Sequence, residues 1–297
     1  MRLDFPKNIK KIRIDVGTGS TAPNTALWLK NNIDTGVLCF EADPRSYNIL
    51  VNGGNTNQYP NELRLTKKNF LVFQDKIIKK IDPDLVKIFN VAISNSNNDK
   101  VNFYLTDDNN FGNSSLLKPI ENKLKQNIVD TIEIPTFKLE YFLDKINFHK
   151  IDYIEFLKID TQGNDLKVIK GCKNYLNKIC FIQTEYWAFN SYKGEKSRKD
   201  CLSFMSNYMN KNGFKLYYYT ITDAFFVNSN LISTILKESI MDNCIDFKNG
   251  LYRKSYFMNI FPGKLLLFAK LIIFLRSFKL FNFLFYRVFK FKFKKFI

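Results

Sequence analysis

Histidine is almost missing from this chain, since His149 is the only one in 297 residues. The sequence therefore argues against a Ser-His-Asp triad and against a His-rich metal site, and we expect His149 at the surface. Cysteine is also sparse, with five scattered residues and no Cys-x-x-Cys pair. This pattern argues against a disulfide framework and a thiolate zinc site, and it favours a reducing compartment.

Long apolar runs are missing as well. The N-terminal stretch MRLDFPKNIKK contains none, so we expect no secretory signal and a cytoplasmic protein. In residues 251–297 the apolar stretches Leu265–Ala269 and Leu271–Leu275 are each followed by a basic residue. Both are too short to span a bilayer, which takes about 20 residues.

Acidic residues are absent from residues 251–297, which hold 11 Lys or Arg of a chain with net charge +17. The remaining +6 on residues 1–250 is weak evidence for nucleic-acid binding by the globular part. We expect one domain over 1–250 and a helical basic aromatic tail over 251–297. At 100° per residue Arg276, Lys279 and Arg287 share one stripe, beside Phe and Leu.

Such a stripe fits an anionic membrane surface, where the protein would be peripheral. Two alternatives stay open for the tail: extra helices packed on the domain, and RNA binding with Phe289, Phe291 and Phe293 stacking on bases. We favour the membrane over nucleic acid.

The stretch Lys11–Thr21, KIRIDVGTGST, predicts a buried strand that ends in the glycine turn Gly17-Thr18-Gly19. Asp15 at the strand end would repel a pyrophosphate but suits a cationic cofactor such as S-adenosylmethionine. A tight turn after a core strand is the plain alternative. Glu41 ends a second apolar run, Gly36–Phe40, after a helix-like segment at Thr25–Asn32. An acid at this place can accept hydrogen bonds from ribose hydroxyls.

The rest of the chain alternates strands and helices. Tyr153–Gly171 predicts a strand ending at Asp160 and then a helix, and Cys180–Trp187 predicts a strand ending near Glu185. We expect a third strand at Leu85–Ile93, paired strands at Val101–Leu105 and Val129–Ile134, helices at Arg45–Val51, Lys138–Ile146 and Lys199–Lys211, and a final hairpin of Lys215–Ile221 and Ala224–Val227. This order predicts an α/β fold with a doubly wound, mostly parallel sheet and an antiparallel terminal hairpin.

Three stretches resemble the FkbM family of S-adenosylmethionine-dependent methyltransferases: IDVGTGSTAPNTALWL with FEADPRSYNIL, FLKIDTQGNDLKVIKG, and the hairpin ending DAFFVN. The resemblance implies a seven-stranded Rossmann-like sheet and methylation of a hydroxyl on a sugar or related small molecule. It assigns the cofactor to Asp15, Gly17, Thr18, Gly19, Glu41, Ala42, Asn90, Val91 and Ala92. A further glycine is common after the first two in the family, whereas Ser20 and Thr21 follow here.

Asp160 and Glu185 are the candidate catalytic residues, since both carboxylates stand at strand ends where they can deprotonate a hydroxyl. Asp160 could instead cap the following helix, Glu185 could likewise have a structural role, and Lys158 could pair with an acid. Asp160, Glu185 and a neighbour would suit Mg²⁺, which the sequence does not require.

The rival functions are a nicotinamide-dependent oxidoreductase and a non-catalytic protein that binds membrane or nucleic acid through the tail. The acceptor pocket is expected at Thr106–Lys118 and Trp187–Arg198.

Overall fold

The computed structural model describes residues 3–20, 22–31, 34–52, 84–107, 112–120, 127–186, 191–193, 198–220 and 222–231. The chain divides into two compact units, Met1–Thr234 and Ile235–Ile297, and every described residue belongs to the first. The domain boundary that we expect after residue 250 and the basic tail at 251–297 lie outside the described residues.

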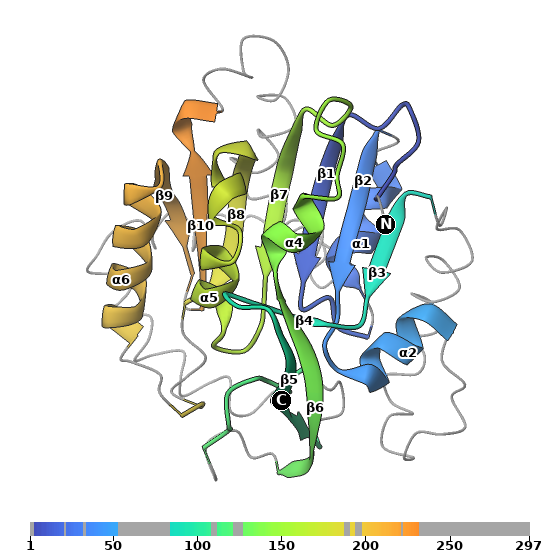
Figure 1. Ribbon diagram of the computed structural model, residues 1–297. Coiled ribbons are helices and arrows are strands. Elements are labelled where there is room, and N and C mark those ends of the chain that lie inside the picture. Colours follow the sequence, from blue (N-terminus) through green and yellow to red (C-terminus); the bar gives the residue numbers. More distant parts are fainter. Residues whose placement is uncertain are drawn as a thin grey trace, which may run out of the picture. The chain divides into compact units, whose positions relative to one another are not determined.

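Strands and helices alternate from β1 to β3, and four successive strands, β3 to β6, then precede the next helix of the described residues (Figure 1). The strands are β1 (Lys11–Val16), β2 (Thr35–Phe40), β3 (Val86–Phe89), β4 (Ala92–Ser94), β5 (Asn98–Thr106), β6 (Ile128–Lys138), β7 (Tyr153–Ile159), β8 (Ile179–Glu185), β9 (Phe214–Tyr219) and β10 (Asp223–Asn228). The helices are α1 (Pro23–Asn31), α2 (Pro44–Asn52), α4 (Leu139–Leu143), α5 (Asp165–Lys170), α6 (Arg198–Lys211) and the 3-10 helix η3 (Lys173–Lys178).

Seven strands form one sheet in the order β3-β2-β1-β7-β8-β10-β9. The first five run parallel, and β10 pairs antiparallel with both β8 and β9. This arrangement confirms the Rossmann-like sheet with its antiparallel terminal hairpin. The strand order reverses between β1 and β7, and ligands of such sheets bind beyond the carboxyl ends of the strands at that point.

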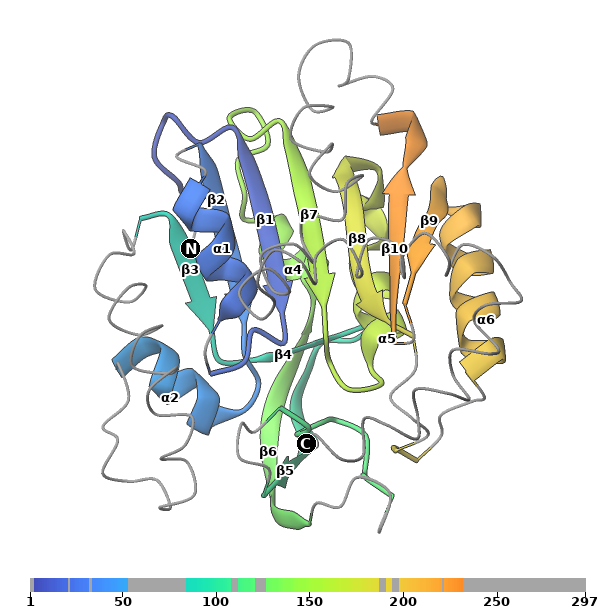
Figure 2. The same cartoon turned by 180° about the vertical axis from the view of Figure 1, so that it is seen from behind.

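Helices cover both faces of the sheet. Figure 1 shows α4 and α5 in front of the central strands, and Figure 2 shows α1 on the opposite face. On that opposite face the ring of Trp28 in α1 meets Phe156 of β7 edge-on, with 5.7 Å between centroids. Helix α6 lies beside α5, because Lys170 of α5 is placed over the rings of Phe204 and Tyr208.

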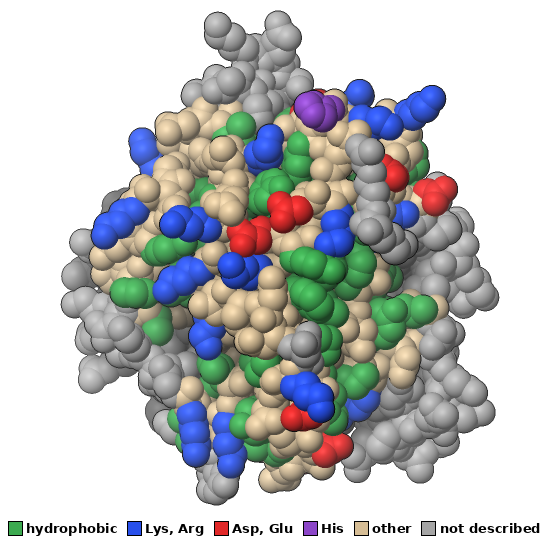
Figure 3. All heavy atoms as spheres, viewed as in Figure 1, with side chains coloured by type: hydrophobic (Ala, Val, Ile, Leu, Met, Phe, Trp, Pro, Cys, Tyr) green, Lys and Arg blue, Asp and Glu red, His purple; other side chains and the backbone are tan. Residues whose placement is uncertain are grey.

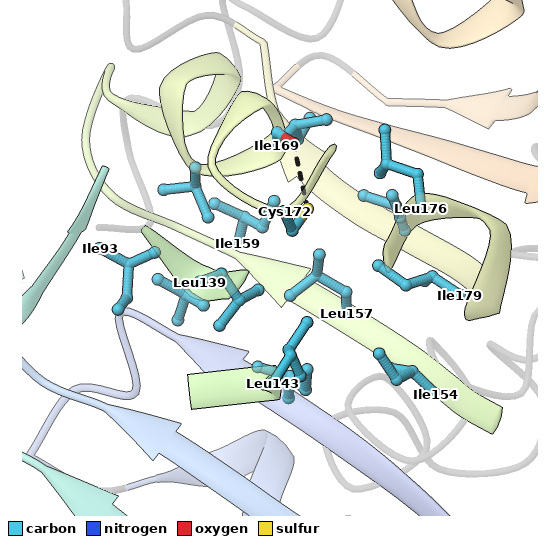
Figure 4. Packing of buried hydrophobic residues seen from close by; sticks show 14 of the residues in the cluster. Ile93, Leu139, Leu143, Ile154, Leu157, Ile159, Ile169, Cys172, Leu176 and Ile179 are labelled. Carbon is cyan, nitrogen blue, oxygen red and sulfur yellow. Dashed lines mark hydrogen bonds between the residues drawn. The ribbon is translucent and has the colours of Figure 1, made fainter. Parts of the chain in front are cut away.

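The main apolar core lies between the sheet and the α4–α5 layer (Figure 4). Alternate residues of the central strands point into it, such as Ile14 of β1 and Leu157 and Ile159 of β7, and all three are almost fully buried. Their neighbours along the strands therefore face the other side of the sheet. On β1 and β7 these neighbours include the charged residues Asp15 and Lys158, which are also buried.

Two expectations from the sequence differ from the structure. The run Leu85–Ile93 is not one strand: β3 ends at Phe89, and β4 joins a second sheet of order β4-β6-β5. The break occurs at Asn90, whose amide donates to the Glu41 carbonyl at 2.9 Å and so takes a place at the sheet end. The helix expected at Lys138–Ile146 is the short α4, because β6 continues to Lys138 and the chain turns after Leu143.

Candidate active site

A cavity of about 450 Å³ lies where β1, β2 and β7 end. This volume is within the range of small-molecule sites in proteins. One wall is formed by the glycine turn after β1 and by Glu41 after β2, and another by Asp160 after β7. Three segments that are far apart in the sequence therefore meet at the reversal in strand order.

The glycine turn is fixed by its backbone geometry. Gly17 and Gly19 have φ angles of 75° and 70°, which side chains rarely tolerate. A Cβ at Gly17 would lie 1.8 Å from the Asp160 carbonyl oxygen, so the turn packs directly on the end of β7. At Gly19 a Cβ would meet no atom within 4 Å, which means that the turn is open toward the cavity there.

Glu41 connects this turn to the end of β2. One carboxylate oxygen accepts the Gly19 N–H at 2.7 Å, and the other accepts the Asp43 N–H at 2.8 Å. Burial raises the pKa of Glu41 to about 7, although the two N–H donors act in the opposite direction. Each carboxylate oxygen has two lone pairs, so Glu41 can still accept hydrogen bonds from a ligand in the cavity.

Asp15 and Lys158 stand side by side on adjacent strands beneath the glycine turn. Asp15 is fully buried, accepts the Thr25 hydroxyl at 3.0 Å, and lies 3.6 Å from the Lys158 ammonium. Burial raises the pKa of Asp15 against the opposing effect of Lys158. Lys158 also donates to the Gly17 carbonyl at 2.9 Å and lies 3.3 Å from Asp160. Burial alone would lower the Lys158 pKa, but Asp160 and Asp15 raise it overall, so this ammonium stays charged.

Asp160 is the more open of the two predicted catalytic carboxylates. Its side chain is 37% exposed, lines the cavity, and accepts a 2.8 Å hydrogen bond from the Gln162 amide. Glu185 stands behind it, 3.5 Å from the same amide. Burial and the nearby carboxylates Asp160 and Asp165 raise the pKa of Glu185 strongly, so it favours its neutral form. Of these two carboxylates, Asp160 is therefore the one that faces the cavity.

A family model named as the methyltransferase FkbM domain matches residues 15–216 of the chain. The protein belongs to the FkbM methyltransferase family. The match runs from Asp15 through β7 and α5 into β9 and thus covers most of the seven-stranded sheet. No curated protein and no solved structure matches the chain.

Most of the cofactor residues implied by the FkbM resemblance meet at the cavity. Those that line it are Gly17, Thr18, Gly19, Glu41, Ala42, Val91 and Ala92, together with the predicted catalytic Asp160. Asp15, Asn90 and Glu185 are not among the described lining residues. Asp15 instead supports the turn from below through Lys158, and Asn90 holds the carbonyls of Glu41 and Ala42. Asp160 does not cap the next helix, because the N-cap of α5 is Asn164.

Two further lining residues, Gln183 and Asp223, were not predicted from the sequence. The Gln183 amide nitrogen donates to the Asp223 carboxylate at 3.1 Å, across the antiparallel pair β8–β10. The Gln183 amide oxygen is buried and has no hydrogen-bond partner among the described residues. The sequence did hold a signal for Gln183, because it precedes the predicted catalytic Glu185 by two residues and its side chain therefore lies on the same face of the strand. This end of the cavity presents hydrogen-bond acceptors from Gln183 and Asp223.

The loop at 112–118 closes another part of the cavity, through Gly112, Ser114 and Leu116. It is tied to the start of α2, because the Ser114 hydroxyl donates to Asp43 at 2.9 Å and accepts from the Arg45 guanidinium at 3.2 Å. Part of the acceptor loop predicted at Thr106–Lys118 thus reaches the cavity. Most of the second predicted loop, 187–198, lies outside the described residues.

Other features expected from the sequence concern the rest of the molecule. Among the described residues no group of three or more His, Cys, Asp and Glu is arranged to hold a metal ion. His149 is exposed, and Figure 3 shows the histidine at the surface among Lys and Arg side chains. In the part of the chain that the structure describes, no helix is long and apolar enough to cross a bilayer.

Proposed function

We propose that this FkbM family member transfers a methyl group from S-adenosylmethionine to a hydroxyl of a sugar or a related small molecule. The observation that carries the proposal is the meeting of Gly19, Glu41 and Asp160 at one cavity. A glycine turn and a strand-end acid suit an adenosyl cofactor, and an exposed carboxylate opposite them suits a proton acceptor.

The described residues fit this cofactor. The open space at Gly19 admits a ligand against the backbone, and Glu41 has unused lone pairs for ribose hydroxyls. Val91 and Ala92, held next to Glu41 by the Asn90 amide, offer an apolar surface to adenine. Among the described residues that line the cavity, the carboxylates of Glu41, Asp160 and Asp223 outnumber the Lys158 ammonium, which suits a sulfonium cation and not a phosphate. When bound, the cofactor supplies an electrophilic methyl group.

Asp160 is placed to take the proton of the acceptor hydroxyl as the oxygen forms its bond to the methyl carbon. Lys158 and Gln162 hold its two oxygens from behind, so the carboxylate keeps one orientation. A positioned base of this kind contributes typically 10²–10⁴-fold to the rate. Gln183 and Asp223 offer acceptors to the other hydroxyls of the substrate, and alignment of the reacting atoms supplies much of the remaining acceleration.

The family match gives no support to the two rival functions. A nicotinamide-dependent oxidoreductase would bind a pyrophosphate at the glycine turn, beside the buried Asp15 and Glu41. A non-catalytic protein that uses only its basic tail would leave the cavity at the reversal of strand order unexplained.

Two measurements test the proposal. Thermal unfolding of the purified chain should shift upward with S-adenosylmethionine and not with NAD, because a ligand that binds only the folded state stabilises it. Incubation with methyl-radiolabelled S-adenosylmethionine and fractionated cell glycans, lipids and RNA should label a glycan fraction, and Asp160→Asn should abolish the label. A thermal shift with NAD alone would contradict the assignment of S-adenosylmethionine as the cofactor. Label confined to RNA would contradict the assignment of a sugar hydroxyl as the acceptor.

A further inference from the structure

Gln162 lies in a turn where its backbone adopts a conformation that is unfavourable for a residue with a side chain. Its φ angle is 54°, in the left-handed region that side chains other than glycine rarely adopt. The residue lies between the end of β7 and the start of α5, two positions after Asp160. A strained non-glycine residue beside a candidate catalytic group calls for a reason other than the turn itself.

The side chain of Gln162 makes contacts in two directions. Its amide nitrogen donates to Asp160 at 2.8 Å and points toward Glu185 at 3.5 Å. Its amide oxygen accepts a hydrogen bond from the Tyr192 hydroxyl at 3.2 Å, and the same hydroxyl also donates to the Asn113 carbonyl at 2.7 Å. The backbone carbonyl of Gln162 accepts the Ser115 hydroxyl at 2.9 Å. One residue therefore joins the carboxylates to two separate loop segments.

Those two segments are also joined to each other. Tyr192 is fully buried and forms an antiparallel bridge with Pro119. The Ile120 N–H donates to the Ser191 carbonyl at 2.7 Å, and the Lys193 N–H donates to the Lys118 carbonyl at 2.9 Å. The segment 112–120 also lines the cavity, through residues that include Ser114 and Leu116. This wall of the cavity is therefore linked to Gln162 by hydrogen bonds through Ser115 and Tyr192.

We propose that Gln162 is a positioning residue that couples the seating of segments 112–120 and 191–193 to the orientation of the Asp160 carboxylate. The inference rests on the proposed function in one respect, the role of Asp160 as the base. When an acceptor packs against Ser114 and Leu116, it stabilises the arrangement in which Tyr192 and Ser115 hold Gln162. In that arrangement the Gln162 amide keeps one Asp160 oxygen fixed and leaves the cavity side of the carboxylate to the acceptor hydroxyl.

The kinetic test uses Gln162→Gly, because glycine accepts the left-handed backbone and only the side chain is removed. We expect the dissociation constant for S-adenosylmethionine to stay unchanged and kcat on the labelled glycan fraction to fall by roughly tenfold to a hundredfold. Tyr192→Phe should give a smaller fall of the same kind. Tyr175→Phe is the matched control: it removes a hydroxyl bonded to Asp144 outside the cavity lining, and it should leave kcat unchanged. Wild-type kcat in Gln162→Gly would overturn the proposal.

The coupling itself is tested without any acceptor. Urea unfolding gives the change in unfolding free energy for Asp160→Asn, for Tyr192→Phe and for their double variant. In the otherwise wild-type chain the two single changes should not add up to that of the double variant, although no hydrogen bond between these two side chains is present among the described contacts. In a chain that also carries Gln162→Gly they should become additive. Additive effects in both backgrounds would overturn the proposal even if methyl transfer is found. Non-additivity that depends on Gln162 would uphold the coupling even if the acceptor is not a glycan.

Discussion

The ammonium of Lys158 lies 3.6 Å from the carboxylate of Asp15, and it also holds the carbonyl of Gly17 at 2.9 Å. This buried ion pair thus supports the glycine turn from inside the sheet. Its position shows how an acid at the end of β1 supports the glycine turn without lining the cavity. The pair has one further partner, Asp160, at 3.3 Å from the same ammonium.

Removal of Lys158 should destabilise the fold. Lys158→Met leaves Asp15 as a buried charge without its partner, and breaking a buried pair in this way costs about 3–5 kcal/mol. Urea unfolding measures the change. The double variant Asp15→Asn with Lys158→Met should recover part of the loss, because position 15 no longer carries a buried charge; Asp160, the other partner of Lys158, is partly exposed in the cavity. Equal instability of the single and double variants would show that the charge is not the cause.

Glu41→Ala should weaken S-adenosylmethionine binding by about 1.5–3 kcal/mol, the range for hydrogen bonds to a charged group. Isothermal titration measures this. In the wild-type protein the affinity should also fall as the pH drops below about 7, because the Glu41 pKa is raised to about 7 and a protonated carboxyl is a poorer acceptor. Glu41→Gln should remove this pH dependence. An unchanged affinity in folded Glu41→Ala would remove Glu41 from the site.

Mild acidification should stabilise the ligand-free protein. The unfolded chain ionises Glu41 near its ordinary value of 4.5, whereas the folded chain keeps the proton up to about pH 7. Between these values the folded state binds more protons, so stability decreases as pH rises through the window and stays low above it. Asp165, with its pKa raised to about 6 mainly by burial, acts in the same direction. Unfolding midpoints at pH 5.5 and 8 should differ less in Glu41→Gln, and a wild-type midpoint that rises with pH would contradict this assignment.

Asp160→Asn should keep the fold and lose most of the turnover. The Asn amide is nearly isosteric with the carboxylate but cannot take the proton from the substrate hydroxyl. A general base contributes typically 10²–10⁴-fold to the rate. Single-turnover methyl transfer measures the loss, with S-adenosylmethionine affinity as the control for an intact cofactor site. A variant with wild-type turnover would make Asp160 a structural residue.

The basic tail at 251–297 should bind anionic membranes, since its sequence places Arg276, Lys279 and Arg287 in one stripe beside Phe and Leu. Co-sedimentation with phosphatidylserine vesicles at low salt compares the full chain with a chain truncated after Gly250. We expect only the full chain to pellet, and phosphatidylcholine vesicles serve as the uncharged control. Equal pelleting of both chains, or of neither, would rule out a membrane anchor in the tail.

Local patterns in the sequence were enough to predict most of the strands and the residues of the glycine turn that line the cavity. A strand, a glycine turn and a strand-end acid follow one another within residues 11–41, so Gly17, Gly19 and Glu41 could be placed without knowledge of the fold. The strand that ends at Asp160 was equally clear. These features depend on residues that are close in sequence.

Contacts between distant segments could not be predicted in the same way. Nothing in the sequence near Gln162 indicates that Tyr192, 30 residues later, bonds to its side chain. The break of the third strand at Asn90 likewise depends on carbonyls at Glu41 and Ala42, almost 50 residues earlier. Lys158 was recognised as a residue that could pair with an acid, but its choice of Asp15 depends on the register of β1 and β7.

The close packing of Gly17 on the Asp160 carbonyl has a consequence for the interpretation of random mutagenesis. Any side chain at Gly17 would have to push the end of β7 away, and Asp160 would move with it. If Asp160 is the base that we propose, a substitution at Gly17 would impair proton removal as well as cofactor binding, and added cofactor would not restore the activity. Second-site revertants of such a variant should arise around Thr161 and Gln162, where the displaced strand end can be accommodated, more often than at Glu41, the residue proposed to bind the ribose.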